Sequence, residues 1–136
     1  MLDVHIDGAS RGNPGLSAIG ITIKNDDKII KEHCEFIGIR TNNQAEYEAL
    51  RRALEICIDM DGEVNISSDS ELLINQRNLK CRIRSQELKI ISREITNLEK
   101  NYDKITYKHI PRTKNSRADY LANKALDKYV GANSKK

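Results

Sequence analysis

The chain has 136 residues and a formal net charge of +3 at pH 7, with 38% hydrophobic and 32% charged residues. This length suits one domain with a single sizeable core, and the composition excludes an intrinsically disordered chain. With one Phe and no Trp, the core must consist mainly of aliphatic side chains. The small excess of basic residues permits a polyanionic partner without requiring one.

The sequence carries no sign of secretion or of a membrane span. Its start, MLDVHIDG, lacks both a basic segment and an apolar stretch, and no apolar run approaches the roughly 20 residues needed to cross a bilayer. We therefore expect a cytoplasmic protein with no membrane contact. Cys34, Cys57 and Cys81 are widely spaced and form no CxxC pair, so neither a disulfide framework nor a zinc site is indicated.

Alternation of apolar and polar residues predicts three strands at the start of the chain. The first covers residues 2–7 and ends at Asp7, where the turn-forming segment DGASRGNPG begins. The second covers residues 17–24, and the turn NDDK leads from it into a third over residues 29–39. Short connections favour an antiparallel meander.

From residue 43 the apolar period changes to three and four, which is typical of a helix. The remaining predicted elements are a helix over residues 43–60, a strand over 64–68, a helix start in SDSELLINQ, a helix over 86–100, a strand over 105–110 and a helix over 116–130. Residues 131–136, GANSKK, are expected to form a disordered tail.

This order of elements predicts an α/β fold, with a mixed sheet of five strands flanked by helices. The strand over residues 64–68 should run parallel to the first strand, because a strand-helix-strand connection within one sheet is a crossover. Residues 1–130 would form a single domain.

Two carboxylates are predicted at the same edge of this sheet. Asp7 ends the first strand, and Asp69 ends the fourth in phase with Asn65 and Ser67. If these strands are parallel neighbours, both acids lie at the carboxyl edge, where α/β folds place their sites.

Two further acids lie on the apolar stripes of helices. Glu46 precedes Ala49 and Leu50 by three and four residues, and Asp119 precedes Ala122 by three. An acid on an inward face is informative, because unpaired buried charge is costly and acids are rarely buried without a partner.

Each of the four acids has an ordinary structural explanation when taken alone. Glu46 and Asp119 can favour the positive end of a helix dipole, and Asp69 can cap a helix. Together they need a common neutraliser, and no single Lys or Arg is patterned to reach all of them. Two divalent cations would do so: ligation by oxygen alone selects Mg²⁺ or Mn²⁺, and two ions about 4 Å apart suit displacement at a phosphodiester.

Four segments of the chain resemble the ribonuclease HI family. They are DGASRGNPG, TNNQAEYEAL, the strand end SSDS and HIPRTKNSRADYLANKAL, in this order, and the resemblance extends from Asp7 to about Tyr129. The chain looks like the compact branch, found in archaea and some bacteria, that lacks an extra basic helical protrusion. The resemblance implies the RNase H-like fold.

The resemblance also implies an activity. It is a metal-dependent endonuclease that hydrolyses the RNA strand of RNA–DNA hybrids, leaving 5′-phosphate and 3′-hydroxyl ends, with two Mg²⁺ or Mn²⁺ ions per site. Asp7, Glu46, Asp69 and Asp119 match the family's catalytic, metal-binding carboxylates. The expected partner is an RNA–DNA hybrid, and the expected oligomeric state is a monomer.

Recognition of the RNA strand requires groups that contact its 2′-hydroxyl. The implied substrate-binding residues are Ser10, Asn13, Thr41, Asn42, Asn43 and Glu71. Helix capping is the alternative role for Asn42 and Asn43, and Thr41 can do either. Glu71 stands where other members have Gln, so it can accept a hydrogen bond from a 2′-hydroxyl or help to hold a metal, but it cannot donate.

Two features depart from the family pattern. The segment PRTKNSR contains no His before Asp119, and Arg112 is the expected substitute, acting as a cation toward phosphate or the transition state. In place of the protrusion, RNLKCRIR offers four basic residues that either contact the phosphates of the DNA strand or belong to a solvated loop.

The sequence leaves two other hypotheses about function open. The same site can act on double-stranded RNA or branched DNA, since relatives of this fold cut several nucleic acids. The chain can also be a non-catalytic nucleic-acid-binding domain, although such a domain would be expected to lack one or more of the four acids.

Overall fold

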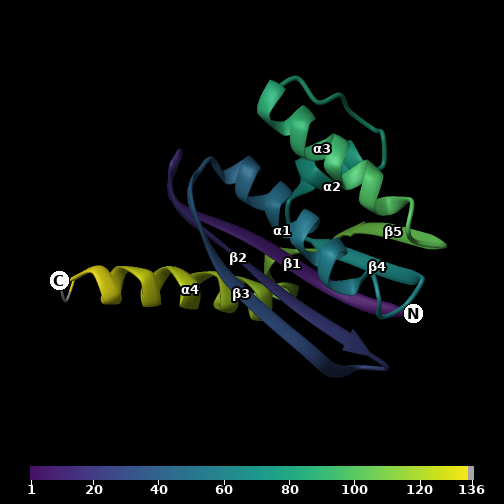
Figure 1. The fold of residues 1–136 in the computed structure, drawn as a ribbon, viewed down its shortest axis with the longest axis horizontal. Helices are drawn as coiled ribbons and strands as arrows, with labels where there is room; N and C mark the ends of the chain where they lie inside the picture. Colours follow the sequence, from purple (N-terminus) through teal and green to yellow (C-terminus); the bar gives the residue numbers. More distant parts are fainter. Residues whose placement is uncertain (135–136) are drawn as a thin grey trace.

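Five strands form one mixed sheet, in the order β3-β2-β1-β4-β5. The computed structural model describes residues 1–134 (Figure 1). Its elements are β1 (Leu2–Gly12), β2 (Gly15–Asn25), β3 (Lys28–Arg40), α1 (Asn42–Cys57), β4 (Glu63–Ser68), α2 (Glu71–Arg77), α3 (Gln86–Glu99), β5 (Lys104–His109), the 3-10 turn η1 (Arg112–Lys114) and α4 (Ser116–Ser134). The first three strands are antiparallel, and β4 and β5 run parallel to β1. The predicted mixed α/β sheet is thus confirmed.

Helices cover both faces of the sheet (Figure 1). On one face, α1 and α3 bury a cluster of apolar side chains with Tyr47, Leu50 and Ile95 among its members. On the other, α4 crosses β1, β2 and β3 and packs Ala125 and Leu126 against the sheet. The apolar periods read from the sequence correspond to these two buried helix faces.

The glycine-rich segment after Asp7 is strand rather than loop, which corrects the predicted end of the first strand. β1 continues to Gly12 and pairs with β2 as far as Gly12 opposite Gly15, so that two residues make the turn. Gly12 has φ +127°, a conformation that L side chains rarely adopt. The alternation of apolar residues stops at Asp7 because this part of the hairpin extends past the buried core.

Two predicted helix ends also differ from the structure. α1 stops at Cys57 rather than at residue 60, since the Asp and Gly residues that follow favour turns over helix. α4 continues to Ser134 and takes in the first four residues of the predicted tail, because one Gly followed by Ala does not stop a helix that is already formed. Lys135 and Lys136, the rest of that predicted tail, lie outside the described residues. Among the residues that are described, no helix has the length and apolarity to span a bilayer.

Candidate active site

A cavity of about 500 Å³ opens at the carboxyl edge of the sheet. It is lined by Asp7, Gly8, Ala9, Ser10, Arg11, Asn42, Asn43, Glu46, Asp69, Ser70, Arg112, Asp119 and Asn123. All four acids singled out in the sequence therefore face one space, together with two arginines and three asparagines. They reach it from β1, α1, the end of β4 and α4.

The register of β1 against β4 brings the first two acids together. Parallel pairing runs from Leu2 opposite Val64 to His5 opposite Ser67 and then stops. Asp7 and Asp69 stand two positions beyond that last pair, so both lie at the point where the strands part. Asp7 does not end β1. On the side away from β4 it is still paired with β2, and this pairing fixes the backbone of Asp7.

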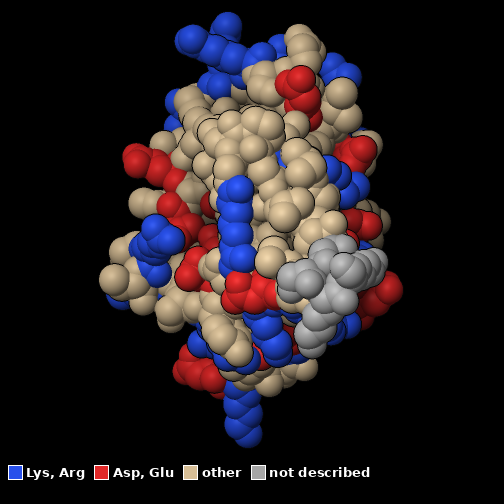
Figure 2. All heavy atoms as spheres, turned by 90° about the vertical axis from the view of Figure 1, so that its left-hand side faces the viewer, with Lys and Arg blue, Asp and Glu red and all other residues tan. Residues whose placement is uncertain are grey.

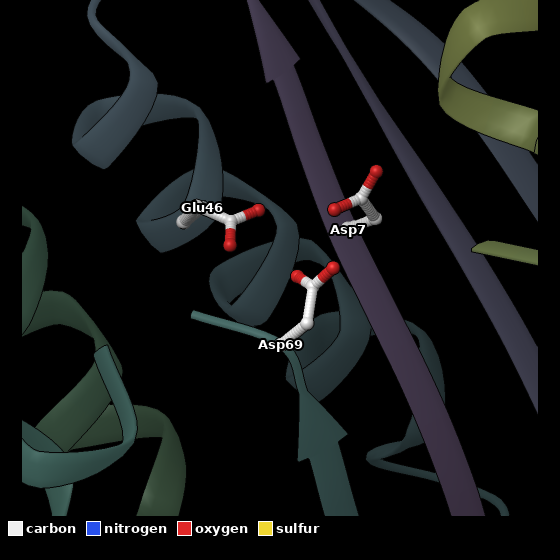
Figure 3. Close-up of side chains that lie close together, drawn as sticks. All are labelled: Asp7, Glu46 and Asp69. Atoms are coloured by element: carbon white, nitrogen blue, oxygen red, sulfur yellow. The ribbon is translucent and has the colours of Figure 1, made fainter. Parts of the chain in front are cut away.

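Three carboxylates converge at this point. Asp7, Glu46 and Asp69 each have an oxygen that lies within 4.8 Å of the others, and Figure 3 shows their carboxyl groups turned toward one another. Asp7 is 6% exposed and Glu46 is 9% exposed. Asp69 is half-buried. Acids packed together in this way, two of them buried, are expensive without a cation or a proton to neutralise them.

The position of Glu46 depends on a close approach of two backbones. Gly8 donates its N–H to Glu46 Oε1 across the gap between β1 and α1. An added Cβ at Gly8 would lie 2.2 Å from the carbonyl carbon of Ala45, so only glycine lets the helix come this close. This contact explains a glycine directly after Asp7 in the sequence.

The electrostatics of the cluster follow from burial and like charge. Burial, and then the neighbouring charges of Glu46, Asp69 and Asp119, raise the pKa of Asp7. Burial also raises the pKa of Glu46, partly opposed by the N–H of Gly8. Within residues 1–134, no Lys or Arg forms a salt bridge with any of the four acids. A set of carboxylate oxygens without a basic partner is a suitable site for a hard divalent cation.

Asp119 enters the cavity from the opposite layer of the fold. It is half-buried in the first turn of α4, and although it is not one of the three mutually close acids, its charge raises the pKa of Asp7. One turn later, Asn123 donates from Nδ2 to the carbonyl oxygen of Asp119 at 3.0 Å and to its Oδ1 at 3.3 Å. The fourth acid is thus held beside the cluster by its own helix.

The residues at the start of α1 divide between capping and the cavity. Thr41 is the N-cap, since its hydroxyl accepts from the N–H of Gln44 at 3.1 Å. Asn42 and Asn43 are the first residues of the helix, and their side chains are free of the capping role and line the cavity. Asn13 accepts the N–H of Asn42 at 3.0 Å and lines an adjoining pocket, so it braces the β1–β2 turn against α1.

The other predicted substrate residues have different placements. Ser10 lines the cavity, although its hydroxyl also donates to the carbonyls of Gly12 and, at 3.0 Å, Arg40. Arg112 is exposed in η1 and lines the cavity. Glu71 is exposed at the start of α2 and is absent from the cavity lining, so the structure does not bring it to the acids.

Sequence reasoning missed three polar residues of the cavity, namely Arg11, Ser70 and Asn123. Asn123 had a usable signal, because it stands four residues after Asp119 and must share its helix face. Ser70 directly follows Asp69 and is also the N-cap of α2. Arg11 had no periodic signal; its guanidinium lies 2.6 Å from Asp127 of α4.

Comparison with known proteins places this site in a family. The sequence profile of the family described as "Reverse transcriptase-like" matches residues 5–125. The solved RNase H1 of the archaeon Halobacterium salinarum is 38% identical, and the superposition covers 93% of this chain and 98% of that one with a TM-score of 0.90. The chain belongs to the ribonuclease HI family.

Other ribonuclease HI relatives agree with this assignment. LC11-RNase H1, solved in complex with an RNA/DNA hybrid, is 36% identical, with a TM-score of 0.91 over 96% of this chain and 99% of that one. The curated Ribonuclease HI of Halobacterium salinarum is 39% identical over 125 residues, which is 90% of this chain. This chain spans 63% of the length of that curated protein.

Proposed function

We propose that this protein is an endoribonuclease that hydrolyses the RNA strand of RNA–DNA hybrids and uses two Mg²⁺ or Mn²⁺ ions. The observation that carries the proposal is the convergence of Asp7, Glu46 and Asp69 in a cavity that also holds Asp119. The membership in the ribonuclease HI family and the relative solved with an RNA/DNA hybrid support the choice of reaction and substrate.

The donor set suits divalent metal ions better than any other cofactor. Asp7, Glu46, Asp69 and Asp119 would hold the ions through their carboxylate oxygens. When bound, the ions supply a water with a lowered pKa and neutralise charge that develops at the phosphate. The like charges that raise the pKa of Asp7 would then be neutralised, and Asp7 would ionise.

The chain's own polar residues would hold the substrate. Arg112 lies on the rim of the cavity, and its guanidinium would bind a phosphate beside the reacting one. Asn42, Asn43 and Ser10 would address the sugar edge, since amides and hydroxyls can bond a 2′-hydroxyl as donor or acceptor. Cleavage at the 3′-oxygen of the phosphodiester would leave a 5′-phosphate and a 3′-hydroxyl.

A second candidate surface for nucleic acid lies next to the cavity of the four acids. Asn43 also lines a neighbouring pocket that includes Arg82 and Arg84, from the segment between α2 and α3. On the face shown in Figure 2, basic side chains stand at the top, centre and bottom with acidic ones between them. We infer that Arg82 and Arg84 contact the phosphates of the DNA strand. Such contacts add binding affinity that depends on salt concentration and not on base sequence.

One assay tests the reaction, the substrate and the metal requirement. The protein is incubated with end-labelled RNA–DNA hybrid, double-stranded RNA or double-stranded DNA, in Mg²⁺, in Mn²⁺ or in EDTA, beside Asp69→Asn. We expect cleavage of the RNA strand of the hybrid in either metal, and none in EDTA or in the variant. Cleavage that survives EDTA or Asp69→Asn would refute the metal-dependent mechanism.

The same assay decides the substrate. Cleavage of double-stranded RNA at a rate similar to that of the hybrid would refute specificity for hybrids. Absence of any cleavage, with Mn²⁺ binding intact, would favour a non-catalytic domain. A monomeric state and a cytoplasmic location remain predictions from the sequence.

A further inference from the structure

Asn115 joins the two layers that carry Asp7 and Asp119. Its side chain is fully buried, and Nδ2 donates to the carbonyl oxygen of Ile6 at 2.8 Å. Ile6 directly precedes Asp7 in β1, and the two bonded residues are 109 positions apart in the chain. A single amide group therefore ties the segment before α4 to the strand position beside the first acid.

Asn115 also fixes the first turn of α4 and the preceding turn η1. Its carbonyl oxygen accepts the N–H of Asp119 at 3.1 Å, and its own N–H donates to the carbonyl oxygen of Arg112 at 3.0 Å. The backbone of Asp119 is thus two hydrogen bonds away from the backbone of β1. Arg112, on the rim of the cavity, is held from the same residue.

The side chain of Asn115 does not make the bond that its position favours. An Asn directly before a helix usually accepts an N–H of the first turn through Oδ1. Here the amide is directed at the sheet instead, and Oδ1 has no hydrogen-bond partner of normal geometry among the described residues. The His5 ring does interact with this side chain, but the interaction only partly offsets the burial that lowers the pKa of His5.

This arrangement is not the one that stability alone would favour. The helix goes without the side-chain cap that an Asn at this position usually supplies. What Asn115 contributes in exchange is position: the Ile6 carbonyl fixes where the helix begins relative to the strand. An apolar residue would fill the same space without fixing that position.

We propose that Asn115 is a positioning residue that clamps the start of α4 to β1 and so holds Asp119 against Asp7. The proposal rests on the proposed function, because Asp119 is there a metal ligand. Asn115 itself touches neither substrate nor metal. Its effect would pass through the backbone of Asp119, in the way that residues behind metal ligands set ligand geometry.

The test compares two variants, each of which removes one long-range hydrogen bond from a side chain to a backbone carbonyl oxygen. Asn115→Ala removes the clamp, and Tyr102→Phe removes the bond from the Tyr102 hydroxyl to the carbonyl oxygen of Leu54, 2.6 Å long and outside the cavity lining. For each variant we measure the thermal midpoint, kcat and KM on the hybrid, and Mn²⁺ binding by calorimetry without substrate.

For Asn115→Ala we expect kcat to fall about 10- to 100-fold and Mn²⁺ to bind at least about 10-fold more weakly, with KM within about twofold. Tyr102→Phe should lower the thermal midpoint and leave kcat and Mn²⁺ binding unchanged. A folded Asn115→Ala protein with normal kcat and normal Mn²⁺ affinity would overturn the proposal.

A second variant covers the case in which Asn115→Ala does not fold. Asn115→Ser keeps a side-chain hydroxyl that can hydrogen-bond to nearby backbone groups but is too short to reach Ile6. We expect the same losses of kcat and Mn²⁺ affinity from it. Normal Mn²⁺ binding by Asn115→Ser would likewise overturn the clamp. If the unaltered protein cuts no hybrid but binds Mn²⁺, the proposed function fails, whereas the calorimetry still decides the role of Asn115.

Discussion

The contact between Gly8 and the first turn of α1 offers a direct test of how the cavity is built. A Cβ at this position would lie 2.2 Å from the carbonyl carbon and 2.4 Å from the carbonyl oxygen of Ala45, and 2.5 Å from the nitrogen of Glu46. Ordinary contacts of a Cβ begin at 3.4 Å, so Gly8→Ala forces β1 and α1 apart by roughly 1 Å. Backbone atoms on both sides leave no flexible side chain that can move instead.

The expected cost has two parts. Forcing a methyl group into this packed contact should lower the free energy of unfolding by about 1–3 kcal/mol. The shift also lengthens the bond from the Gly8 N–H to Glu46 and moves that carboxylate away from Asp7. Because a displacement of about 1 Å in a catalytic group can cost about 100-fold in rate, we expect a loss of that order in kcat.

The assay pairs initial rates on the hybrid with denaturant unfolding, and Gly131→Ala is the matched control. A Cβ at Gly131, in α4, would meet no atom of the described residues within 4 Å, so this variant should keep full activity and gain about 0.5–1 kcal/mol of stability. The reasoning is refuted if Gly8→Ala retains activity within about threefold of the unaltered protein, since the two backbones would then not need to touch.

Three further predictions concern charge. Arg112→Ala should lower kcat at least about 10-fold and leave Mn²⁺ affinity unchanged, because the cation stabilises phosphate charge but binds no metal; single-turnover rates and calorimetry check this, and an unchanged rate removes Arg112 from the site. In EDTA, burial and like charge raise the pKa of Asp7 to about 9 and that of Glu46 to about 8, so both stay protonated in the folded protein at a pH where the unfolded chain has ionised them. Their contribution to the free energy of unfolding is therefore fully present only below about pH 4 and is lost as the pH rises toward 8 to 9. The thermal midpoint should therefore decrease as the pH is raised from about 5 to about 8, and it should decrease less steeply for Asp7→Asn. If the difference in thermal midpoint between the two proteins is the same at every pH, this prediction is contradicted. Replacing Arg82 and Arg84 by Ala should weaken hybrid binding and reduce the slope of log affinity against log salt by about two, measured by fluorescence anisotropy; an unchanged slope assigns both to solvent.

Much of the site was readable as local pattern. The helical period placed Glu46 on the buried stripe of α1 and Asp119 on the inner face of α4, and both positions hold in the structure. The crossover rule placed β4 parallel to β1, which put Asp69 beside Asp7. These inferences succeeded because side-chain direction within a helix or strand follows from residue spacing alone.

The errors came from segments where spacing carries no such information. The end of β1 was placed at Asp7, five residues too early, because a hairpin that extends past the core needs no apolar alternation. Glu71, which the resemblance assigns to the substrate, is exposed on α2 and outside the cavity lining, and its role stays a prediction. Arg11 was missed, since its place depends on how α4 lies against the hairpin.

The sequence by itself determined the order of the elements and the faces on which the four acids lie. It also showed that no single Lys or Arg is patterned to reach all four, which favours a divalent metal. Only the tertiary structure decided the distances: the end of β1–β4 pairing after His5, the backbone contact at Gly8, and the clamp from Asn115 to Ile6. Periodicity is a property of neighbours in the chain. Register and helix approach are instead fixed by contacts between residues tens of positions apart, because the whole core must pack at once.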